Sequence, residues 1–175
     1  MQGYATREVG TAIRQNEESF DDLIIAMAQP AYRLAWALLR DADAAKDIVQ
    51  DASVIAWRKI GRLDDRSRFR SWFLGIVANE CRNARRKAAR IHVGLPADAA
   101  HASEEDRAVL RADLRRALQE LGYEDRLVVV LYFYLDLPLA DVATIARTSE
   151  GAARVRIHRA IRRLRPGVAV EEDLR

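Results

Sequence analysis

Apolar residues recur at steps of three and four along residues 41–60, and this spacing restricts the stretch to an amphipathic α-helix. Asp41 stands at the predicted N-cap, where unpaired backbone N–H groups need an acceptor. Arg58 and Lys59 fall in the last turn, where positive charge interacts favourably with the helix dipole. The predicted apolar face consists of Ala44, Ile48, Ala52, Ile55, Ala56 and Ile60.

Charge is segregated along the chain although the net charge is only +3. Basic residues concentrate between positions 57 and 90 and again between 145 and 166, and an acidic stretch separates the two blocks. Two basic patches joined by an acidic connector indicate a polyanionic partner that is contacted at two places. The helix at 41–60 carries in addition an acidic outward face, formed by Asp47, Gln50 and Asp51.

Residues 66–90 interleave arginine and lysine with Phe69, Trp72 and Phe73. Cations follow phosphates and aromatic faces stack on bases, so this composition is typical of a surface for single-stranded nucleic acid. The alternative is an ordinary amphipathic helix with core aromatics and solvated arginines, because aromatics at helical spacing usually pack inward. The cations are Arg66, Arg68, Arg70, Arg82, Arg85, Arg86, Lys87 and Arg90.

A helix is also predicted over residues 20–39, which Pro30 can break or kink, whereas residues 1–19 read as frayed or weakly helical. Residues 91–107, with Gly, Pro and small polar side chains, read as a flexible linker. A helix closed by Gly122 follows it.

The run at residues 127–135, LVVVLYFYL, is ambiguous. Its β-branched and aromatic content favours a strand, but a lone strand among helices has no pairing partner, so we predict a helix. Beyond it, a short apolar helix around Val142, a turn at 147–149 and an arginine-rich helix from Glu150 to about Leu164 have the form of a helix-turn-helix. A plain helical hairpin with solvated arginines is the alternative.

No catalytic or metal-binding pattern competes with nucleic-acid binding. His92, His101 and His158 lack the ligand spacing of a zinc site, and P-loop, GxGxxG and GxSxG motifs are missing from the sequence. Cys81 is the single cysteine, so an internal disulfide is excluded. Its side chain is more typical of a buried packing residue than of a reactive thiolate. We expect no cofactor, no metal and no enzymatic activity, and we expect neither export nor membrane insertion.

Both modules, in this order, resemble the extracytoplasmic-function (ECF) class of bacterial RNA polymerase sigma factors. Region 2 of that family is matched by YRLAWALLRDADAAKDIVQDASVIAWRKI and then SRFRSWFLGIVANECRNARRK. Region 4 is matched by LRRALQELGYEDRLVVVLYFYLDLPLADVATIARTSEGAARVRIHRAIRRL. The resemblance implies an all-α protein made of two small helical domains and a flexible linker. The expected divisions are an extension at 1–19, region 2 at 20–90, a linker at 91–107, region 4 at 108–168 and a tail at 169–175.

The resemblance also implies a role for each module. The helix with Asp47, Val49, Gln50 and Asp51 would dock on the β′ clamp helices of core RNA polymerase, and the segment at 127–135 would engage the β flap. The basic aromatic segment would hold an unstacked base of the −10 promoter element, and the last helix would enter the major groove of the −35 element. The implied −10 residues are Arg66, Arg68, Phe69, Arg70, Trp72, Asn79, Arg82 and Arg86, and the −35 residues are Glu150, Gly151, Arg154, Arg156 and Arg159.

A few positions depart from the usual pattern of the family. Arg147 replaces a small residue in the turn, and Ala152 and Val155 replace hydroxyl residues that often contact the DNA backbone, which leaves the −35 contacts open. The family further implies a cytoplasmic protein with promoter DNA and an anti-sigma factor as partners. The alternative function is a stand-alone helix-turn-helix transcriptional regulator whose N-terminal half is an oligomerisation domain.

Overall fold

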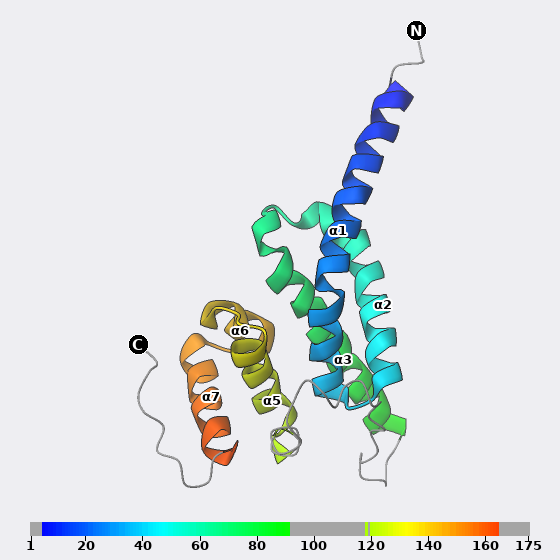
Figure 1. Cartoon of the computed structure of the whole chain (residues 1–175). Helices are drawn as coiled ribbons and strands as arrows, with labels where there is room; N and C mark the ends of the chain where they lie inside the picture. Colours follow the sequence, from blue (N-terminus) through cyan, green and yellow to red (C-terminus); the bar gives the residue numbers. More distant parts are fainter. Residues whose placement is uncertain (1–4, 92–117, 119, 165–175) are drawn as a thin grey trace.

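The computed structural model describes residues 5–91, 118 and 120–164, with side chains from residue 20 to 89, at 118 and from 120 to 164. All of its regular elements are helical, and none of the described residues lies in a β-strand. The helices form two modules, which we call the first module (α1 to α3) and the second module (α5 to α7) (Figure 1). The first module consists of α1 (Ala5–Leu39), α2 (Ala42–Lys59), the 3-10 turns η1 (Ile60–Arg62) and η2 (Arg66–Arg68), and α3 (Phe69–Ile91).

Helix α1 is longer than the sequence pattern predicts. Its backbone is helical from Ala5, so of the two interpretations of residues 1–19, frayed or weakly helical, the helical one holds from residue 5 onward. This extension rises beyond the other helices in Figure 1. The helix also continues through Pro30 without a break, at the cost of one backbone donor. The predicted inward face is confirmed, because Phe20, Met27 and Leu34 are among its buried residues.

Small side chains let α2 approach its neighbours closely. Ala45, Ala52 and Ala56 are completely buried along the face that α2 turns toward α1 and α3. Large residues of the facing helices, Leu34 and Phe73 among them, fill the space that these alanines leave. Asp41 caps the helix as predicted, because its Oδ1 accepts hydrogen bonds from the backbone N–H groups of residues 43 and 44, both at 3.0 Å.

The second module contains the predicted helix-turn-helix. Its α6 and α7 pack on each other and on α5, and Ala153, Ile157 and Ala160 of α7 are buried at that junction. The linker at 91–107 and most of the helix predicted to end at Gly122 lie outside the described residues. The elements are α5 (Tyr123–Val129), η4 (Val130–Tyr134), α6 (Leu139–Ala146) and α7 (Glu150–Leu164).

The ambiguous run at 127–135 is helical, as predicted from its context. It starts in α5 and then widens into the π-helical turn η4, in which the N–H of Leu135 donates to the carbonyl of Val130 at 2.9 Å. Leu127, Val128 and Leu131 are fully buried, so the β-branched composition at the start of the run reflects burial, whereas Phe133 near its end is exposed. A π turn shifts the register of the side chains and often accompanies a functional surface.

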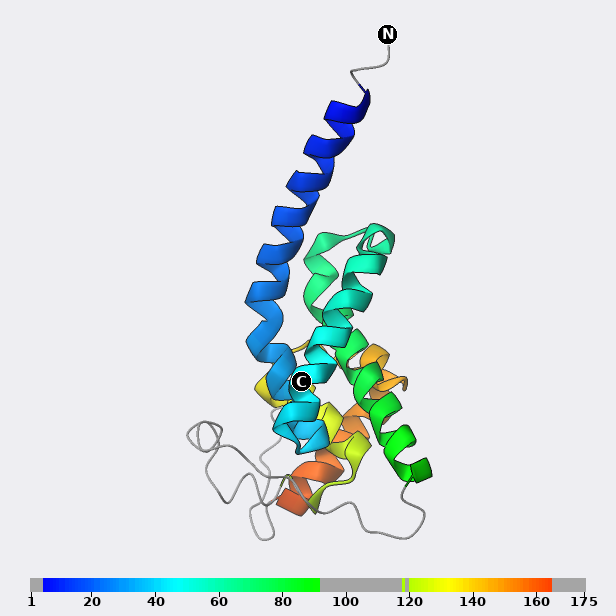
Figure 2. The ribbon, with the colours of Figure 1, turned by 90° about the vertical axis from the view of Figure 1, so that its right-hand side faces the viewer.

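The two modules share one hydrophobic core. The buried cluster runs without interruption from Phe20 and Phe73 of the first module to Leu127, Val142 and Ile157 of the second. Helix α3 packs on α6, and α1 packs on α5 and η4. Figures 1 and 2 show the second module beside the part of α1 and α3 that lies away from the N-terminal extension. The structure therefore describes a closed arrangement, which the sequence did not predict.

Candidate nucleic-acid interface

The acidic face of α2 is open to solvent. Asp47, Gln50 and Asp51 are all exposed, whereas Val49 between them is half-buried against the core. None of these polar side chains supports the packing of the first module. Asp47, Gln50 and Asp51 therefore form one accessible polar surface, whereas Val49, predicted together with them, lies on the side of α2 that packs toward the core.

A short structured loop leads from α2 into α3. The Oδ1 atom of Asp65 caps η2 by accepting a hydrogen bond from the backbone N–H of Ser67 at 2.9 Å. Hydrogen bonds from the side chain and backbone of Ser67 hold the pKa of the Asp65 carboxyl below its usual value. The loop is thus fixed with Arg66 and Arg68 exposed at the start of α3.

Phe69 does not belong to the exposed surface. Only 2% of it is exposed, its ring stacks on that of Phe73 at a centroid distance of 5.7 Å, and it meets the edge of Phe20 at 6.3 Å. A ring packed in this way has no face for a base, so the core alternative holds for Phe69 and its predicted DNA contact is corrected. Trp72, one turn along, is only half-buried.

A cavity of about 520 Å³ lies between the modules. This volume is within the range of roughly 300 to 1,000 Å³ that is common for ligand sites. Arg68, Trp72 and Asn79 line it from the first module, and Thr144 and Arg147 line it from α6. Four of the eight predicted −10 residues, Arg68, Trp72, Asn79 and Arg82, thus line one hollow, and the second module supplies one of its walls.

Three of the predicted −10 residues bond to the second module. The guanidinium of Arg82 donates to the backbone carbonyl of Ile145 at 3.0 Å and lies 3.4 Å from a carboxylate oxygen of Glu124. Arg70 donates to the backbone carbonyl of Leu135. Asn79 accepts a hydrogen bond from the Arg147 guanidinium at 2.6 Å. The remaining cation of the set, Arg86, is exposed near the end of α3.

Helix α7 presents a basic face, but not every predicted arginine lies on it. Ser149 caps the helix as predicted, because its Oγ accepts from the N–H of Ala152 at 3.2 Å. Arg156 is turned aside, with its guanidinium 3.7 Å from a carboxylate oxygen of Glu124. The exposed members of the predicted set are Glu150, Gly151, Arg154 and Arg159.

The turn before α7 has a left-handed backbone at Arg147, with φ of 54° and ψ of 48°. This conformation costs a non-glycine residue about 1 kcal/mol, and a glycine would adopt it freely. The backbone conformation of this turn therefore does not explain why the residue at position 147 is an arginine. Its side chain, which reaches Asn79, is the feature that distinguishes it from a glycine.

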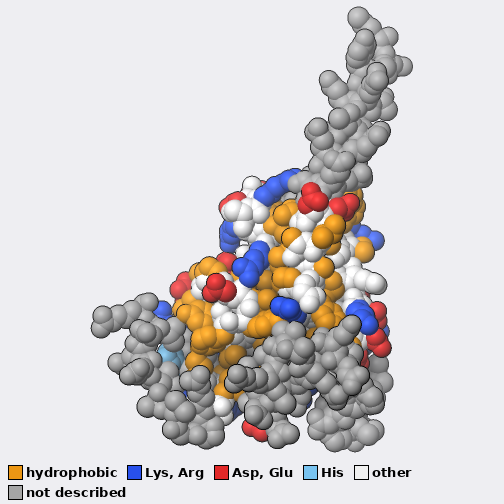
Figure 3. All heavy atoms as spheres, viewed as in Figure 1, with side chains coloured by type: hydrophobic (Ala, Val, Ile, Leu, Met, Phe, Trp, Pro, Cys, Tyr) orange, Lys and Arg blue, Asp and Glu red, His pale blue; other side chains and the backbone are white. Residues whose placement is uncertain are grey.

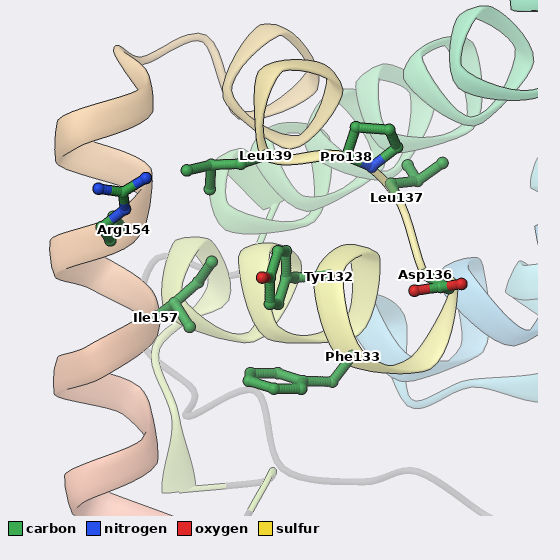
Figure 4. A pocket seen from close by; sticks show the side chains of 8 residues that line it. All are labelled: Tyr132, Phe133, Asp136, Leu137, Pro138, Leu139, Arg154 and Ile157. Atoms are coloured by element: carbon green, nitrogen blue, oxygen red, sulfur yellow. The ribbon is translucent and has the colours of Figure 1, made fainter. Parts of the chain in front are cut away.

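A second hollow lies on the second module, where η4, the following turn and α7 meet (Figure 4). Its volume is about 530 Å³. Figure 4 shows Tyr132, Leu139 and Ile157 converging on it, with Phe133 at its edge. Phe133 is 55% exposed, which is unusual for a large aromatic residue and indicates a surface for an apolar partner.

Cys81 is completely buried on α3, and burial raises the pKa of its thiol to about 12. The prediction that Cys81 is a buried packing residue is confirmed. We expect the native protein to resist alkylation by iodoacetamide at pH 8, with at least about a hundredfold slower reaction than in guanidinium chloride, because little thiolate forms and the reagent lacks access. Mass spectrometry of the alkylated chain measures this, and rapid native labelling would contradict the packing of α3.

The remaining expectations concern metal sites and membrane-spanning helices. Among the described residues, no three His, Cys, Asp or Glu side chains are grouped so that they could hold a metal ion. His92 and His101 lie outside the described residues. None of the described helices combines the length and the apolarity that crossing a membrane requires.

Sequence reasoning missed several residues that shape this interface. Glu124 bridges Arg82 and Arg156, and Arg126 fastens the second module to α1 through the carbonyl of Ala37 at 3.2 Å. Local sequence patterns do not predict such contacts, because the partners are far apart in the sequence. Among these residues, only Arg147 could have been singled out from the sequence, since an arginine stands where a small residue is usual.

Two family models match the chain. Sigma-70 region 2 matches residues 23–91, and Sigma-70, region 4 matches residues 111–164. Together they account for most of the chain. The region 2 match coincides with the first module, and the region 4 match coincides with the second.

Curated relatives and a solved structure agree with these matches. RNA polymerase sigma factor CarQ of Myxococcus xanthus is 30% identical over 156 residues, which cover 85% of this chain and 88% of the relative. ECF RNA polymerase sigma factor SigL of Mycobacterium tuberculosis is 30% identical over 141 residues, covering 77% of this chain and 80% of the relative. The sigma factor RpoE from Bartonella quintana, solved with the anti-sigma factor NepR, superposes with a TM-score of 0.69 at 25% identity, covering 86% of this chain and 94% of that one.

Proposed function

The chain belongs to the extracytoplasmic-function class of RNA polymerase sigma factors, and from this premise we propose which of its surfaces meet the polymerase and the promoter. As a sigma factor it binds core RNA polymerase and directs promoter recognition and the initiation of transcription. The joint match to regions 2 and 4 in one chain carries this conclusion. A stand-alone regulator with an oligomerisation domain is not favoured, because the N-terminal half is itself a sigma region.

We propose that the division of labour follows the two modules. Residues 20–90 would bind core polymerase and the −10 element, and residues 108–168 would bind the −35 element, with 91–107 as the connection. Residues 1–19 and 169–175 would be an extension and a tail. The helices of each module pack mainly on one another, although α1 and α3 also contact the second module, and this grouping supports the division.

The acidic face of α2 is the proposed contact with the β′ clamp helices. Asp47, Gln50 and Asp51 are exposed and without a packing role, and Val49, half-buried at the edge of the core, belongs to the same proposed contact. A polar face with two carboxylates suits an interface whose specificity is electrostatic.

The −10 surface is proposed to centre on the cavity at the start of α3. Its aromatic member is Trp72, since Phe69 is buried, and its amide is Asn79. Stacking of a base on an aromatic face contributes about 1 to 3 kcal/mol, which can offset the cost of unstacking it. Of the proposed cations, Arg68 and Arg82 line this cavity, whereas Arg66, Arg70 and Arg86 belong to the same basic segment but not to its lining.

The −35 surface is proposed to be the exposed early part of α7. Recognition helices present such early residues to base edges, and Arg154 is exposed there. Arg156 is a weaker candidate than the sequence suggested, because Glu124 holds it toward α5. The hollow beside Tyr132 and Phe133 is the proposed site for the β flap, as it lies on the same module and combines apolar side chains with Asp136 and Arg154.

We expect Arg154→Ala to reduce run-off transcription about tenfold on a promoter selected with the wild-type holoenzyme. An arginine paired with a guanine contributes about 1 to 3 kcal/mol of discrimination. Arg162→Ala is the matched control, because Arg162 is exposed on the same helix but lies two turns later. Its effect should be less than about threefold, and binding to core polymerase should survive in both variants. Equal losses would mean a diffuse electrostatic patch.

The family consists of non-catalytic initiation factors, and we propose that this chain has no enzymatic activity of its own and works in the cytoplasm. An anti-sigma factor is a proposed partner, since the matched sigma factor RpoE was solved in complex with one. Figure 3 shows basic side chains dispersed over the one face in view. Each basic block of the sequence is short, and the proposed −10 surface requires separated strands, so we do not expect strong binding of duplex DNA by the free chain.

The decisive experiment is a pull-down with core RNA polymerase followed by run-off transcription on genomic fragments. The proposed function requires that the chain co-purifies with core and that transcripts start at discrete sites only when it is present. Tight, sequence-specific binding of duplex DNA by the isolated chain, without binding to core, would instead indicate the stand-alone regulator.

A further inference from the structure

Val155 is an apolar residue at the centre of the outward face of α7. It is 62% exposed, and among the described residues of the second module no large apolar side chain is more exposed. In the sequence it stands midway between Ala153 and Ile157, which are both buried where α7 packs on α5 and α6. Successive residues of an α-helix are about 100° apart, so a residue two positions from a buried one on either side points almost directly away from the core.

The neighbours of Val155 on this face are a glycine and two arginines. Gly151 lies about one turn before it, Arg159 and Arg162 lie about one and two turns after it, and all three are exposed. No other part of the protein lies within 4 Å of the place where a Cβ would stand at position 151, so packing does not require a glycine there. The glycine therefore leaves room in front of Val155 for the close approach of another molecule.

The two arginines next to Val155 in the sequence leave the helix on opposite sides. Arg154 lines the hollow shown in Figure 4. The guanidinium of Arg156 lies 3.7 Å from a carboxylate oxygen of Glu124 on α5. The middle of the early part of this face is therefore apolar, and the arginines are placed at its sides and toward its end.

A valine side chain can recognise only an apolar group. It has no hydrogen-bond donor or acceptor, so it can neither read the polar edge of a base nor bind a phosphate. In the major groove the C5 methyl of thymine is the apolar group that a base pair presents. Packing that methyl on an exposed aliphatic side chain removes both surfaces from water, which is favourable. For a helix that lies in the major groove, the partner that fits Val155 is thus a thymine.

We propose that Val155 sets part of the −35 specificity by packing its isopropyl group on the C5 methyl of one thymine in the −35 element. The inference rests on the proposed entry of α7 into the −35 major groove. It explains the departure at this position, where valine replaces a hydroxyl residue: a side chain that would contact the DNA backbone is exchanged for one that contacts a base. This base pair is then recognised by an apolar contact and not by a hydrogen bond.

Deoxyuridine tests the contact, because it lacks the C5 methyl of thymine and keeps the same hydrogen-bonding groups. In a promoter selected with the wild-type holoenzyme, each thymine of the −35 element, on either strand, is replaced in turn. The affinity of the holoenzyme for each promoter is measured by competition in a gel-shift assay. We expect one of these replacements to weaken binding about fourfold, which corresponds to the loss of one buried methyl group.

Val155→Ala should remove this sensitivity. The holoenzyme with this variant is expected to bind the thymine promoter about fourfold more weakly than wild type, and to bind the thymine and the uridine promoters equally. The helix should persist, because alanine favours helices and the side chain points away from the core. Val54→Ala is the matched control, since it shortens an exposed valine of α2 in the same way and should keep the wild-type ratio between the two promoters.

A second control separates this contact from the attraction between arginine and phosphate. Arg159→Ala removes an exposed cation one turn after Val155. A lost phosphate contact weakens binding to all sequences alike, so this variant should bind both promoters more weakly and keep the ratio between them.

The outcomes distinguish the valine contact from the −35 role of α7. If Arg154→Ala impairs transcription but no uridine replacement weakens the wild type, or Val155→Ala keeps the same sensitivity, the methyl contact is overturned and the −35 role stands. A selected −35 element without thymine has the same meaning. If Val155→Ala weakens binding to core polymerase itself, the valine belongs to a protein contact, which also overturns the proposal. If Arg154→Ala, Val155→Ala and base changes in the −35 element all have no effect, the −35 role fails and the valine contact fails with it.

Discussion

Replacing Arg126 with methionine is expected to lower the free energy of unfolding by about 3 kcal/mol. The guanidinium donates to three backbone carbonyls: those of Leu118 at 2.9 Å, Leu121 at 2.8 Å and Ala37 at 3.2 Å. Arg126 is 8% exposed, and burial lowers its pKa to about 10, so it still carries its charge at neutral pH. Methionine keeps much of the apolar stem but leaves buried carbonyls without this donor.

Urea denaturation followed by circular dichroism measures this change. Arg58→Met is the matched control, because the same substitution at an exposed position of α2 should change stability by less than about 0.5 kcal/mol. Because Arg126 reaches Ala37 of α1, its loss should also make the second module unfold at a lower urea concentration than the first. A variant as stable as wild type would mean that water replaces these bonds and that the modules are held by apolar packing alone.

The largest functional effect is expected from Asp51→Lys, which should weaken binding to core RNA polymerase by about a hundredfold. Asp51 is exposed on the face of α2 that is proposed to dock on the β′ clamp helices, and placing a like charge in an interface costs several kcal/mol. The fold should tolerate the change, because the side chain has no packing role. Surface plasmon resonance with immobilised core polymerase gives the affinity directly.

Two controls separate a specific contact from a general effect of charge. Asp51→Asn keeps the shape and removes the charge, so a loss between those of wild type and Asp51→Lys is expected. Asp21→Lys makes the same charge reversal at an exposed position of α1, outside the proposed docking face, and should leave affinity within about twofold. If Asp21→Lys weakens binding as much as Asp51→Lys, net charge and not the α2 face governs association with core.

Local patterns in the sequence were sufficient for the helices and for their caps. Asp41 and Ser149 cap α2 and α7 as predicted, since an N-cap depends on residues within one turn of each other. The exposure of Asp47, Gln50 and Asp51 also follows from helical periodicity alone. The predicted helix starts only at residue 20, with residues 1–19 frayed or weakly helical, because the six polar residues 14–19 interrupt the apolar pattern before Phe20.

The distinction between core and surface aromatics could not be made from the sequence. Phe69 and Trp72 both fit a stacking surface by composition, yet Phe69 is buried between Phe20 and Phe73 while Trp72 lines the cavity. Which ring turns inward depends on where the neighbouring helices lie. The same holds for Arg156, which periodicity placed outward and Glu124 draws toward α5.

The sequence by itself determined an all-α chain with two basic modules, because helical periodicity, capping and charge depend on residues close together in the chain. Only the tertiary structure decided that these modules close on each other, with Arg82 bonded to Ile145 and Arg147 bonded to Asn79. Those partners are separated by more than 60 residues, and a hydrogen bond at such a separation depends on the packing of whole helices. Local sequence patterns carry no information on that packing.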